Sequence, residues 1–388
     1  MRAFQHISPP LRLFHGPDSL RALARELERL ERRRSVIFCG GTLAREGRLL
    51  GMARDALGGS CAGVFSGVKA HSPAPAVEEA ARELRRLEAD AVIAIGGGSA
   101  VVTARAASIL LAEQGELAAL ATSVDERGTL RSPKLLAPKL PQLIIPTTPN
   151  TAMTRAGSAV FDPVAGARRA LFDPKTRAHA IFIHPDFAAS APEALVVSAS
   201  LNTFAFTMEG LMSPAGDPIA DALLIHGLRL VARHLPDPAL AEDATVRSEL
   251  IVASVLCGQG TNSTSAGIIT TLGHAIGARH GVENGIANAI VLPHALRFNG
   301  DAAQEGLAKV ATALELRRED KPLVETVIEA VLGVFGRLGV PARLRDVGVA
   351  REDLPSLAEL AMGDWFLRGN PRPVRSADEV QRVLEEAW

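Results

Sequence analysis

The sequence contains no tyrosine, only two tryptophans and only three cysteines among its 388 residues. The absence of tyrosine excludes a tyrosine general acid from any reaction that the protein catalyses. Cys39, Cys61 and Cys257 lie far apart, with no CxxC motif and no Cys/His cluster at metal-ligand spacing. This cysteine usage argues for a reducing compartment and against a structural zinc site.

The sequence also lacks an excess of charge of either sign. It contains 42 basic and 43 acidic residues, and this balance gives no electrostatic footprint for nucleic acid or for an anionic membrane. Its first residues lack the apolar core of a signal peptide, and no uninterrupted apolar run approaches the roughly 20 residues needed to span a bilayer. We therefore expect a cytoplasmic protein that acts on a small molecule and binds neither nucleic acid nor membrane.

The length of the chain and its 47% hydrophobic content favour two domains. In the first half, short β-branched runs alternate with helical patterns, which is typical of a parallel sheet with crossover helices. The expected strands cover residues 34–40, 61–68, 90–95, 141–148, 157–161 and 180–185. Residues 116–141 are rich in Pro, Ser and Lys, and we expect them to form a surface excursion.

Strand signals stop after about Phe187, and almost everything from Pro192 to Trp388 is helical in pattern. The predicted fold class is therefore an α/β domain with a parallel sheet over residues 1–187, followed by an all-α domain over residues 188–388.

A glycine-rich loop follows the strand at 90–95. Gly96, Gly97 and Gly98 precede Ser99 and a helical pattern. Glycines allow the backbone to approach a ligand closely, and a helix N-terminus presents free N–H groups to phosphate. The loop therefore suggests a pyrophosphate site. A tight turn with no ligand is the alternative, since a GGGS motif alone is weak evidence.

Two further strand ends carry small or hydroxyl side chains. The segment IPTTPNT (145–151), at the end of the strand expected over 141–148, contains Thr147, Thr148 and Thr151, and the strand at 34–40 runs into Gly40, Gly41 and Thr42. The carboxyl ends of parallel strands meet at one edge of a sheet, where such folds bind ligands. We therefore expect these residues to form one dinucleotide site.

The strand at 34–40 indicates which dinucleotide is bound. No acidic residue ends the strand at Cys39, where dinucleotide folds commonly hold the ribose 2′-hydroxyl. Arg45, one helical turn further on, could instead meet a 2′-phosphate, which favours NADP over NAD. A solvent-exposed Arg45 with no such role is the alternative.

Five motifs together resemble the iron-containing alcohol dehydrogenase superfamily, whose fold is shared with glycerol dehydrogenase and dehydroquinate synthase. They are GGGS (96–99), IPTT (145–148), LNTFAFTMEGLMSP (201–214), LGHAIGARHGVENGIANAIVLPHALRFN (272–299) and NPRPV (370–374). The resemblance implies a dinucleotide-binding domain over 1–187, a helical substrate and catalytic domain over 188–388, and hydride transfer in the cleft between them. It also implies a homodimer.

The resemblance implies four metal-ligand positions, which in metal-dependent members hold one Asp and three His. Those positions here carry Asn202, Phe206, Thr270 and Asn284. A first-row metal needs carboxylate, imidazole or thiolate ligands, so these residues predict a site that holds no metal. The polar three are expected either to orient a polar substrate or to satisfy one another around water.

The maleylacetate reductase branch resembles the chain more closely than the metal-dependent members do. Val102 stands where those members have an aspartate after GGGS, and Asn202, Glu209 and Pro214 match the first-helix pattern of the branch. The branch keeps its histidines on these helices, however. Phe206 and Asn284 therefore depart from it.

Without a metal, a hydrogen-bond donor or general acid must stabilise the oxygen that gains charge during hydride transfer. His274, which matches a family histidine beside the cofactor, is the first candidate, and His280 is the second; histidine exchanges a proton near neutral pH. The alternatives are a satisfied core histidine for His274 and a helix-end residue for His280.

The histidines at 71, 179, 184 and 294 show no partner pattern that indicates a role. Arg155, Arg168 and Arg169 follow the IPTT segment, and they could meet a substrate carboxylate or the cofactor phosphates, as we expect for Arg169. A solvated hairpin is the simpler account of Arg168 and Arg169.

The sequence therefore predicts a metal-independent NAD(P)H-dependent oxidoreductase that reduces a small activated carbonyl compound, such as a maleylacetate-like oxo acid, an aldehyde or a ketone. One alternative is a catalytically silent nucleotide-binding homologue that acts as a partner protein. The other is a lyase-like enzyme that uses bound NAD for transient oxidation.

Overall fold

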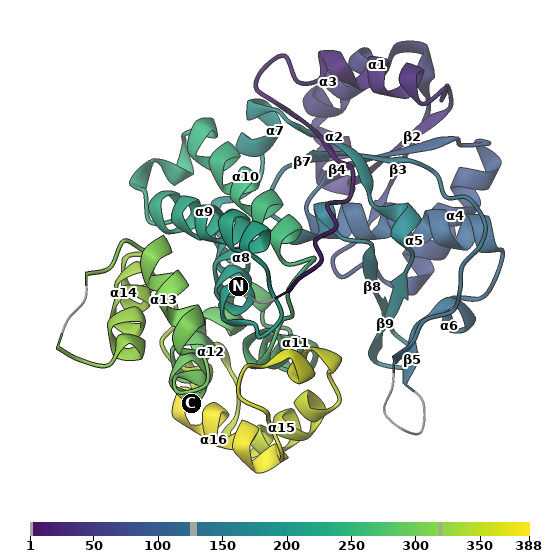
Figure 1. Ribbon diagram of the computed structural model, residues 1–388. Coiled ribbons are helices and arrows are strands. Elements are labelled where there is room, and N and C mark those ends of the chain that lie inside the picture. Colours follow the sequence, from purple (N-terminus) through teal and green to yellow (C-terminus); the bar gives the residue numbers. More distant parts are fainter. Residues whose placement is uncertain (1–2, 125–129, 318–319) are drawn as a thin grey trace. The chain divides into compact units, whose positions relative to one another are not determined.

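The computed structural model describes residues 3–124, 130–317 and 320–388 (Figure 1). The chain divides into two compact units. The first, Pro9–Ala191, is called the α/β unit here. The second, the helical unit, consists of Pro192–Trp388 and the described residues that precede Pro9. The sequence predicts those first residues to belong to the α/β domain, but they cluster with the helices, where the His6 imidazole bonds the Asp217 carboxylate at 2.9 Å.

The α/β unit contains a six-stranded sheet in the order β1-β10-β7-β4-β2-β3, and every neighbouring pair is parallel. Its strands are β1 (Arg12–His15), β2 (Ser35–Gly40), β3 (Cys61–Val68), β4 (Ala91–Gly96), β7 (Gln142–Pro146) and β10 (Ala178–Ile183). The five predicted strands of this sheet are confirmed. The prediction missed β1 because it is a four-residue edge strand with no buried residue.

Helices cover both faces of this sheet (Figure 1). One face packs on α1 (Arg21–Arg29), α3 (Arg48–Leu57) and α7 (Pro185–Ala189), with Leu23, Leu27 and Phe187 fully buried against it. The other face carries α4 (Ala74–Arg86) and α5 (Gly98–Glu113). The strands are buried on both faces, which explains why they appear in the sequence as continuous apolar runs rather than as alternating ones.

Three features of the α/β unit lie outside the main sheet. The helical stretch expected after β2 is split into α2 (Gly41–Glu46) and α3, because Gly47 has a φ of 72°. The predicted strand at 157–161 is confirmed as β8 (Gly157–Asp162), which forms an antiparallel hairpin with β9 (Ala167–Phe172). The expected surface excursion contains α6 (Leu117–Leu120), β5 (Ser123–Val124) and β6 (Leu130–Arg131), and its residues 125–129 lie outside the described residues.

The described residues from Pro192 onward form helices and no strand, as the sequence predicts. The α-helices of this unit are α8 (Glu193–Met212), α9 (Pro218–His234), α10 (Ala244–Gly260), α11 (Ile268–His280), α12 (Asn284–Asn299), α13 (Gln304–Ala313), α14 (Leu323–Arg337), α15 (Leu354–Met362) and α16 (Ala377–Ala387).

Helix α8 is the core helix of this unit, and α9, α10, α11, α12 and α13 all contact it. Every residue from Thr203 to Met212 is buried, so the polar residues of this segment are enclosed together with the apolar ones. Among the described residues, α8 is the one helix long and apolar enough to cross a membrane, but 78% of its apolar window is buried inside the protein. That degree of burial is typical of a core helix.

Glycines allow α8, α11 and α12 to approach one another closely. A Cβ atom on Gly285 of α12 would lie 1.8 Å from the Ser198 carbonyl oxygen of α8, and one on Gly273 of α11 would lie 1.8 Å from the Asn288 Oδ1 atom of α12. Neither position has room for a side chain. The two glycines therefore fix the spacing of the helices that carry the predicted site residues.

Candidate functional site

The strand order of the α/β unit places a topological switch point between β2 and β4. These strands are neighbours, but the chain leaves β2 toward β3 on one side and leaves β4 toward β7 on the other. In open α/β sheets, ligands bind outside the carboxyl ends of the strands at such a point. Gly40 and Gly96 each stand two residues beyond the last β2–β4 pair, Phe38 with Ala94. The predicted glycine segments therefore begin at the same level of the sheet.

The structure brings the GGGS loop against the two threonines that follow β7. The backbone N–H of Thr147 donates to the Gly96 carbonyl oxygen at 3.1 Å, and a Cβ on Gly97 would lie 2.9 Å from Thr148 Oγ1. Gly96 has a φ of 142°, a backbone conformation that favours glycine. The loop therefore requires glycine at two successive positions for different reasons, one for its backbone conformation and one for close approach.

Helix α5 begins directly after this loop, with Gly97 as its N-cap and Gly98 and Ser99 in its first turn. The first N–H groups of a helix have no partner inside the helix, and together with the helix dipole they favour a phosphate group. A 16-residue helix that opens on glycines at a switch point is thus a suitable cradle for the pyrophosphate of a dinucleotide.

The other predicted nucleotide residues lie near these strand ends or on the β8–β9 hairpin. The guanidinium of the exposed Arg45 folds back over the start of α2 and donates to Thr42 Oγ1 at 3.3 Å. Thr151 begins the short 3-10 helix η2 (Thr151–Thr154). Arg169 donates from Nε to Asp162 Oδ2 at 2.9 Å within the hairpin. This contact agrees with the hairpin alternative for Arg169. Its contact with a nucleotide stays a prediction.

Arg105 of α5 holds this region together, a role that was not predicted from the sequence. It is 1% exposed, and its guanidinium donates to the carbonyl oxygens of Ala152, Gly157 and Thr176 at 2.8, 2.7 and 3.3 Å. Burial, aided by two nearby arginines, lowers the pKa of Arg105 to about 9. Arg105 thereby ties η2, just after the threonine loop, to α5. An arginine within the apolar run AVVTARAASILL was the available signal.

In the helical unit, Glu209 of α8 lies against the N-terminus of α11. Its Oε1 accepts the backbone N–H groups of Gly267 and Ile269 at 3.0 and 2.8 Å, and its Oε2 accepts the Thr270 hydroxyl at 2.5 Å. Burial raises the pKa of Glu209 to about 7, although the hydrogen bonds to it act in the opposite direction. The Thr270 hydroxyl, expected to face a substrate or a metal position, is therefore engaged as the donor to Glu209.

The three other predicted substrate residues make different contacts. Asn202 accepts a hydrogen bond on Oδ1 from Asn288 Nδ2 at 2.9 Å. Phe206 is buried in a small apolar cluster with Cys257, Ala266 and Phe366. Asn284, at the start of α12, packs so close to Gly277 of α11 that a Cβ there would lie 2.8 Å from its Oδ1. Only Asn202 combines a partly exposed side chain with a defined polar partner.

His274 forms a pair with Asp364 that the sequence did not predict. The Nδ1 atom of His274 lies 2.8 Å from Asp364 Oδ2, and the histidine ring is 5.7 Å from that of Phe366, which belongs to the cluster around Phe206. The other oxygen of Asp364 accepts the Phe366 backbone N–H at 2.9 Å, which fixes the carboxylate. An aspartate that accepts Nδ1–H orients the ring and stabilises its protonated form.

His280, the second catalytic candidate, occupies the last turn of α11 before Gly281. Its Nε2 atom lies 3.6 Å from Asp353 Oδ2. Placement in the last turn corresponds to the helix-end alternative, since the C-terminal end of a helix favours a basic side chain.

The residues at the four implied ligand positions do not fit a metal ion. They provide two amides, a phenyl ring and a hydroxyl that donates to Glu209, whereas a first-row metal requires carboxylate, imidazole or thiolate groups. Across residues 3–124, 130–317 and 320–388, no group of three or more His, Cys, Asp or Glu side chains is arranged to hold a metal.

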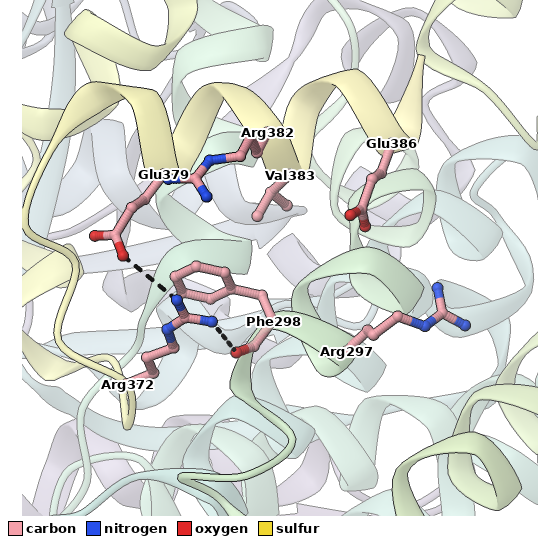
Figure 2. Close-up of a pocket in the computed structure, with 7 residues that line it drawn as sticks. All are labelled: Arg297, Phe298, Arg372, Glu379, Arg382, Val383 and Glu386. Atoms are coloured by element: carbon pink, nitrogen blue, oxygen red, sulfur yellow. Dashed lines mark hydrogen bonds and ion pairs between the residues drawn. The ribbon is translucent and has the colours of Figure 1, made fainter.

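The helical unit also contains a pocket of about 240 Å³, whose lining includes none of these four residues (Figure 2). The charges of two of its three arginines are compensated by carboxylates, since Arg297 pairs with Glu325 at 2.9 Å and Arg372 with Glu379 at 3.4 Å. Figure 2 shows the lining residues, none of which is a predicted site residue: Arg297, Phe298, Arg372, Glu379, Arg382, Val383 and Glu386.

Two family models match nearly the whole chain. The model of iron-containing alcohol dehydrogenase matches residues 10–185, and that of the C-terminal part of the Fe-containing alcohol dehydrogenase family matches residues 196–388. The chain belongs to the iron-containing alcohol dehydrogenase family.

Curated relatives and solved structures agree with this assignment. The chain is 29% identical to the lactaldehyde reductase of Escherichia coli (strain K12) over 96% of this chain and 97% of the relative. It is 27% identical to the maleylacetate reductase of Pseudomonas aeruginosa over 97% and 95%. The fold matches sulfoacetaldehyde reductase from Bifidobacterium kashiwanohense in complex with NAD+, with a TM-score of 0.86, 19% identity and coverage of 100% and 99%. The chain is thus an enzyme of the alcohol dehydrogenase and reductase class.

Proposed function

We propose that the protein is a metal-independent NAD(P)H-dependent reductase of a small activated carbonyl compound. The observation that carries the proposal is the donor set at the four implied ligand positions, where Asn202, Phe206, Thr270 and Asn284 do not fit a metal. The glycine loop and threonines at the switch point support dinucleotide binding, as does the NAD+ complex of a structural relative. The position of Arg45 over the start of α2 supports a preference for NADP.

NAD(P)H held at the glycine loop and the threonines after β7 would supply the hydride, its nicotinamide C–H bond breaking to leave NAD(P)+ as the carbonyl carbon gains the hydrogen. As the carbon–hydride bond forms, the π electrons of the carbonyl group move to its oxygen, which takes a proton to give the alcohol. We assign that proton to the imidazolium of His274, which becomes neutral. Asp364 accepts the Nδ1–H bond throughout, so it orients the ring and stabilises the charged form before the proton leaves.

A site without a metal ion has no Lewis acid, and this limits the substrates that the enzyme can reduce. A metal contributes several kcal/mol of charge stabilisation to a developing alkoxide. An enzyme without one is best suited to carbonyl groups that are already activated, such as an oxo acid, its enol tautomer or an aldehyde. Maleylacetate-like oxo acids fit this class, and a maleylacetate reductase is among the relatives.

The test of the proposal combines metal analysis with nucleotide binding and turnover. We expect no stoichiometric metal, quenching or enhancement of NADPH or NADH fluorescence on binding, and oxidation of the nucleotide when oxo acids or aldehydes are added. Stoichiometric metal required for turnover would remove metal independence, and failure to bind either nucleotide would remove the reductase assignment.

Gly97→Ala is expected to weaken NADPH binding about tenfold or more. The new Cβ would lie 2.9 Å from Thr148 Oγ1, and overpacking of this kind costs about 1–3 kcal/mol, which displaces the loop that receives the pyrophosphate. Fluorescence titration measures the change. Gly59→Ala is the matched control, because a Cβ at Gly59 meets no atom within 4 Å; equal Kd values for the two variants would contradict the assigned loop.

The same four substituted positions favour a second candidate, a catalytically silent nucleotide-binding homologue that acts as a partner protein. Binding of NAD(P)H with no turnover on any activated carbonyl would select it. We further propose that the enzyme is cytoplasmic and homodimeric; light scattering of the purified protein tests the dimer.

A further inference from the structure

We infer that Asn288 is a positioning residue that turns the amide of Asn202 so that its N–H groups, and not its carbonyl oxygen, are presented to a ligand. The inference deepens the proposed function and rests on it for its chemical meaning: Asn202 becomes a hydrogen-bond donor for the carbonyl oxygen of the substrate. The orientation itself is a property of three packed helices of one unit and can be measured without substrate.

The polar contacts of Asn202 leave one edge of its amide available. Asn288 Nδ2 donates to Asn202 Oδ1 at 2.9 Å, and within the described residues this is the one hydrogen bond that Asn202 makes through its side chain. Asn288 is 2% exposed, whereas Asn202 is only partly buried. Because the buried partner takes the oxygen of Asn202, the two N–H donors of Asn202 form the available edge.

The orientation of Asn288 is set by Gly273 on α11. A Cβ on Gly273 would lie 1.8 Å from Asn288 Oδ1, so this oxygen directly faces the Gly273 Cα hydrogen. Oxygen accepts a weak Cα–H contact, whereas an NH₂ group in its place would face a carbon and lose its hydrogen bond. The Oδ1 atom has no other partner in the described part of the chain. Gly273 therefore directs the Nδ2 of Asn288 toward α8.

Such a donor favours substrates that offer an acceptor oxygen. During hydride transfer negative charge grows on that oxygen, and a preorganised N–H donor stabilises it more in the transition state than in the ground state. Removing one such donor typically costs about two to three orders of magnitude in kcat. The site would thus select oxo compounds and disfavour ligands that present only donors.

Side-chain NMR of protein labelled with ¹⁵N-asparagine tests the orientation directly. We expect the Asn288 NH₂ protons to be protected from exchange with water and the Asn202 NH₂ protons to exchange fast. In Asn288→Asp, whose carboxylate only accepts, the Asn202 amide must turn, and its NH₂ protons become protected. A protected Asn202 NH₂ in the wild type, or no change in Asn288→Asp, overturns the inference.

Kinetics give the functional test. Asn288→Asp is expected to lower kcat for an oxo acid about 100-fold with an unchanged Kd for NADPH. The matched control is Asn299→Asp: Asn299 is also buried on α12 and shares two hydrogen bonds with an asparagine, Asn370. A purely structural role for Asn288 predicts equal loss of activity in both variants and overturns the inference.

The outcomes separate this inference from the proposed function. A wild type that lacks turnover but shows the expected exchange pattern keeps the orientation and removes the reductase. A wild type with turnover but the reverse pattern removes the orientation alone. If Asn288→Asp does not fold, Asn202→Asp is used instead. Asn202 is only partly buried and Asp is nearly isosteric with Asn, so this variant replaces the donor by an acceptor with little change in shape. The same loss of kcat is expected.

Discussion

Replacement of His274 by alanine is expected to lower kcat for carbonyl reduction by about two to four orders of magnitude, the usual contribution of general acid catalysis. The Kd for NADPH is expected to stay within about twofold, because the variant removes a proton donor and leaves the glycine loop intact. Stopped-flow measurement of NADPH oxidation at saturating substrate gives the rate of carbonyl reduction. Unchanged turnover would remove His274 from the chemistry.

Further variants show which residues carry the loss of kcat. Asp364→Asn keeps the size of the side chain but withdraws the charge that stabilises the imidazolium, so we expect a loss of kcat smaller than that of His274→Ala. Because the two residues bond at 2.8 Å, their effects should be strongly non-additive in the double variant. His280→Ala decides between the two histidine candidates, and His226→Ala, at an exposed position on α9, is the control.

Glu209→Gln is expected to change the pH dependence of stability. Burial raises the pKa of Glu209 from 4.5 to about 7 in the folded protein, so the folded state holds this proton more tightly than the unfolded state does. The stabilisation is therefore complete below about pH 4.5 and is lost as the pH rises through about 7. Between about pH 4.5 and a pH above 7, Glu209 therefore lowers the free energy of unfolding by on the order of 3 kcal/mol. The neutral glutamine removes this pH dependence.

His294 provides the opposite control in the same pH range. Burial, reinforced by Arg343 and Arg297, lowers the pKa of His294 from 6.5 to about 4, so its contribution is lost as the pH falls from about 6.5 to about 4. The wild type shows the difference of the two effects. Urea unfolding at several pH values between 4.5 and 7.5 gives the free energy of unfolding as a function of pH. Relative to the wild type, the slope of this free energy against pH should be more positive in Glu209→Gln and more negative in His294→Gln. Identical slopes in all three proteins would contradict the assignment.

The parallel sheet and the helical second half could be predicted because each strand is a continuous apolar run and the crossover helices are regular. The position of the GGGS loop beside the threonines that follow β7 could also be predicted, since residues that follow neighbouring parallel strands share one edge. The edge strand β1 could not be predicted, because its four residues bury little surface and carry no pattern. The break at Gly47 likewise depends on a backbone conformation that the sequence signals only weakly.

The polar pairs of the helical unit could not be predicted from the sequence. Asn288 lies 86 residues from Asn202, and Asp364 lies 90 residues from His274. No local spacing links such partners, because they meet only when separate helices pack. The chemical types at positions 202, 206, 270 and 284 could be compared with a ligand set one by one, but the partner of each polar group required the structure.

The contact between Gly273 and Asn288 has a consequence for how this protein can change by mutation. A side chain at position 273 of α11 would displace Asn288 on α12, and through it the amide of Asn202 on α8. The three positions are therefore energetically coupled, and substitutions among them should not combine additively. A lineage that acquired a carboxylate at position 202 would be constrained in the order in which the three residues could be exchanged, because each intermediate must still pack.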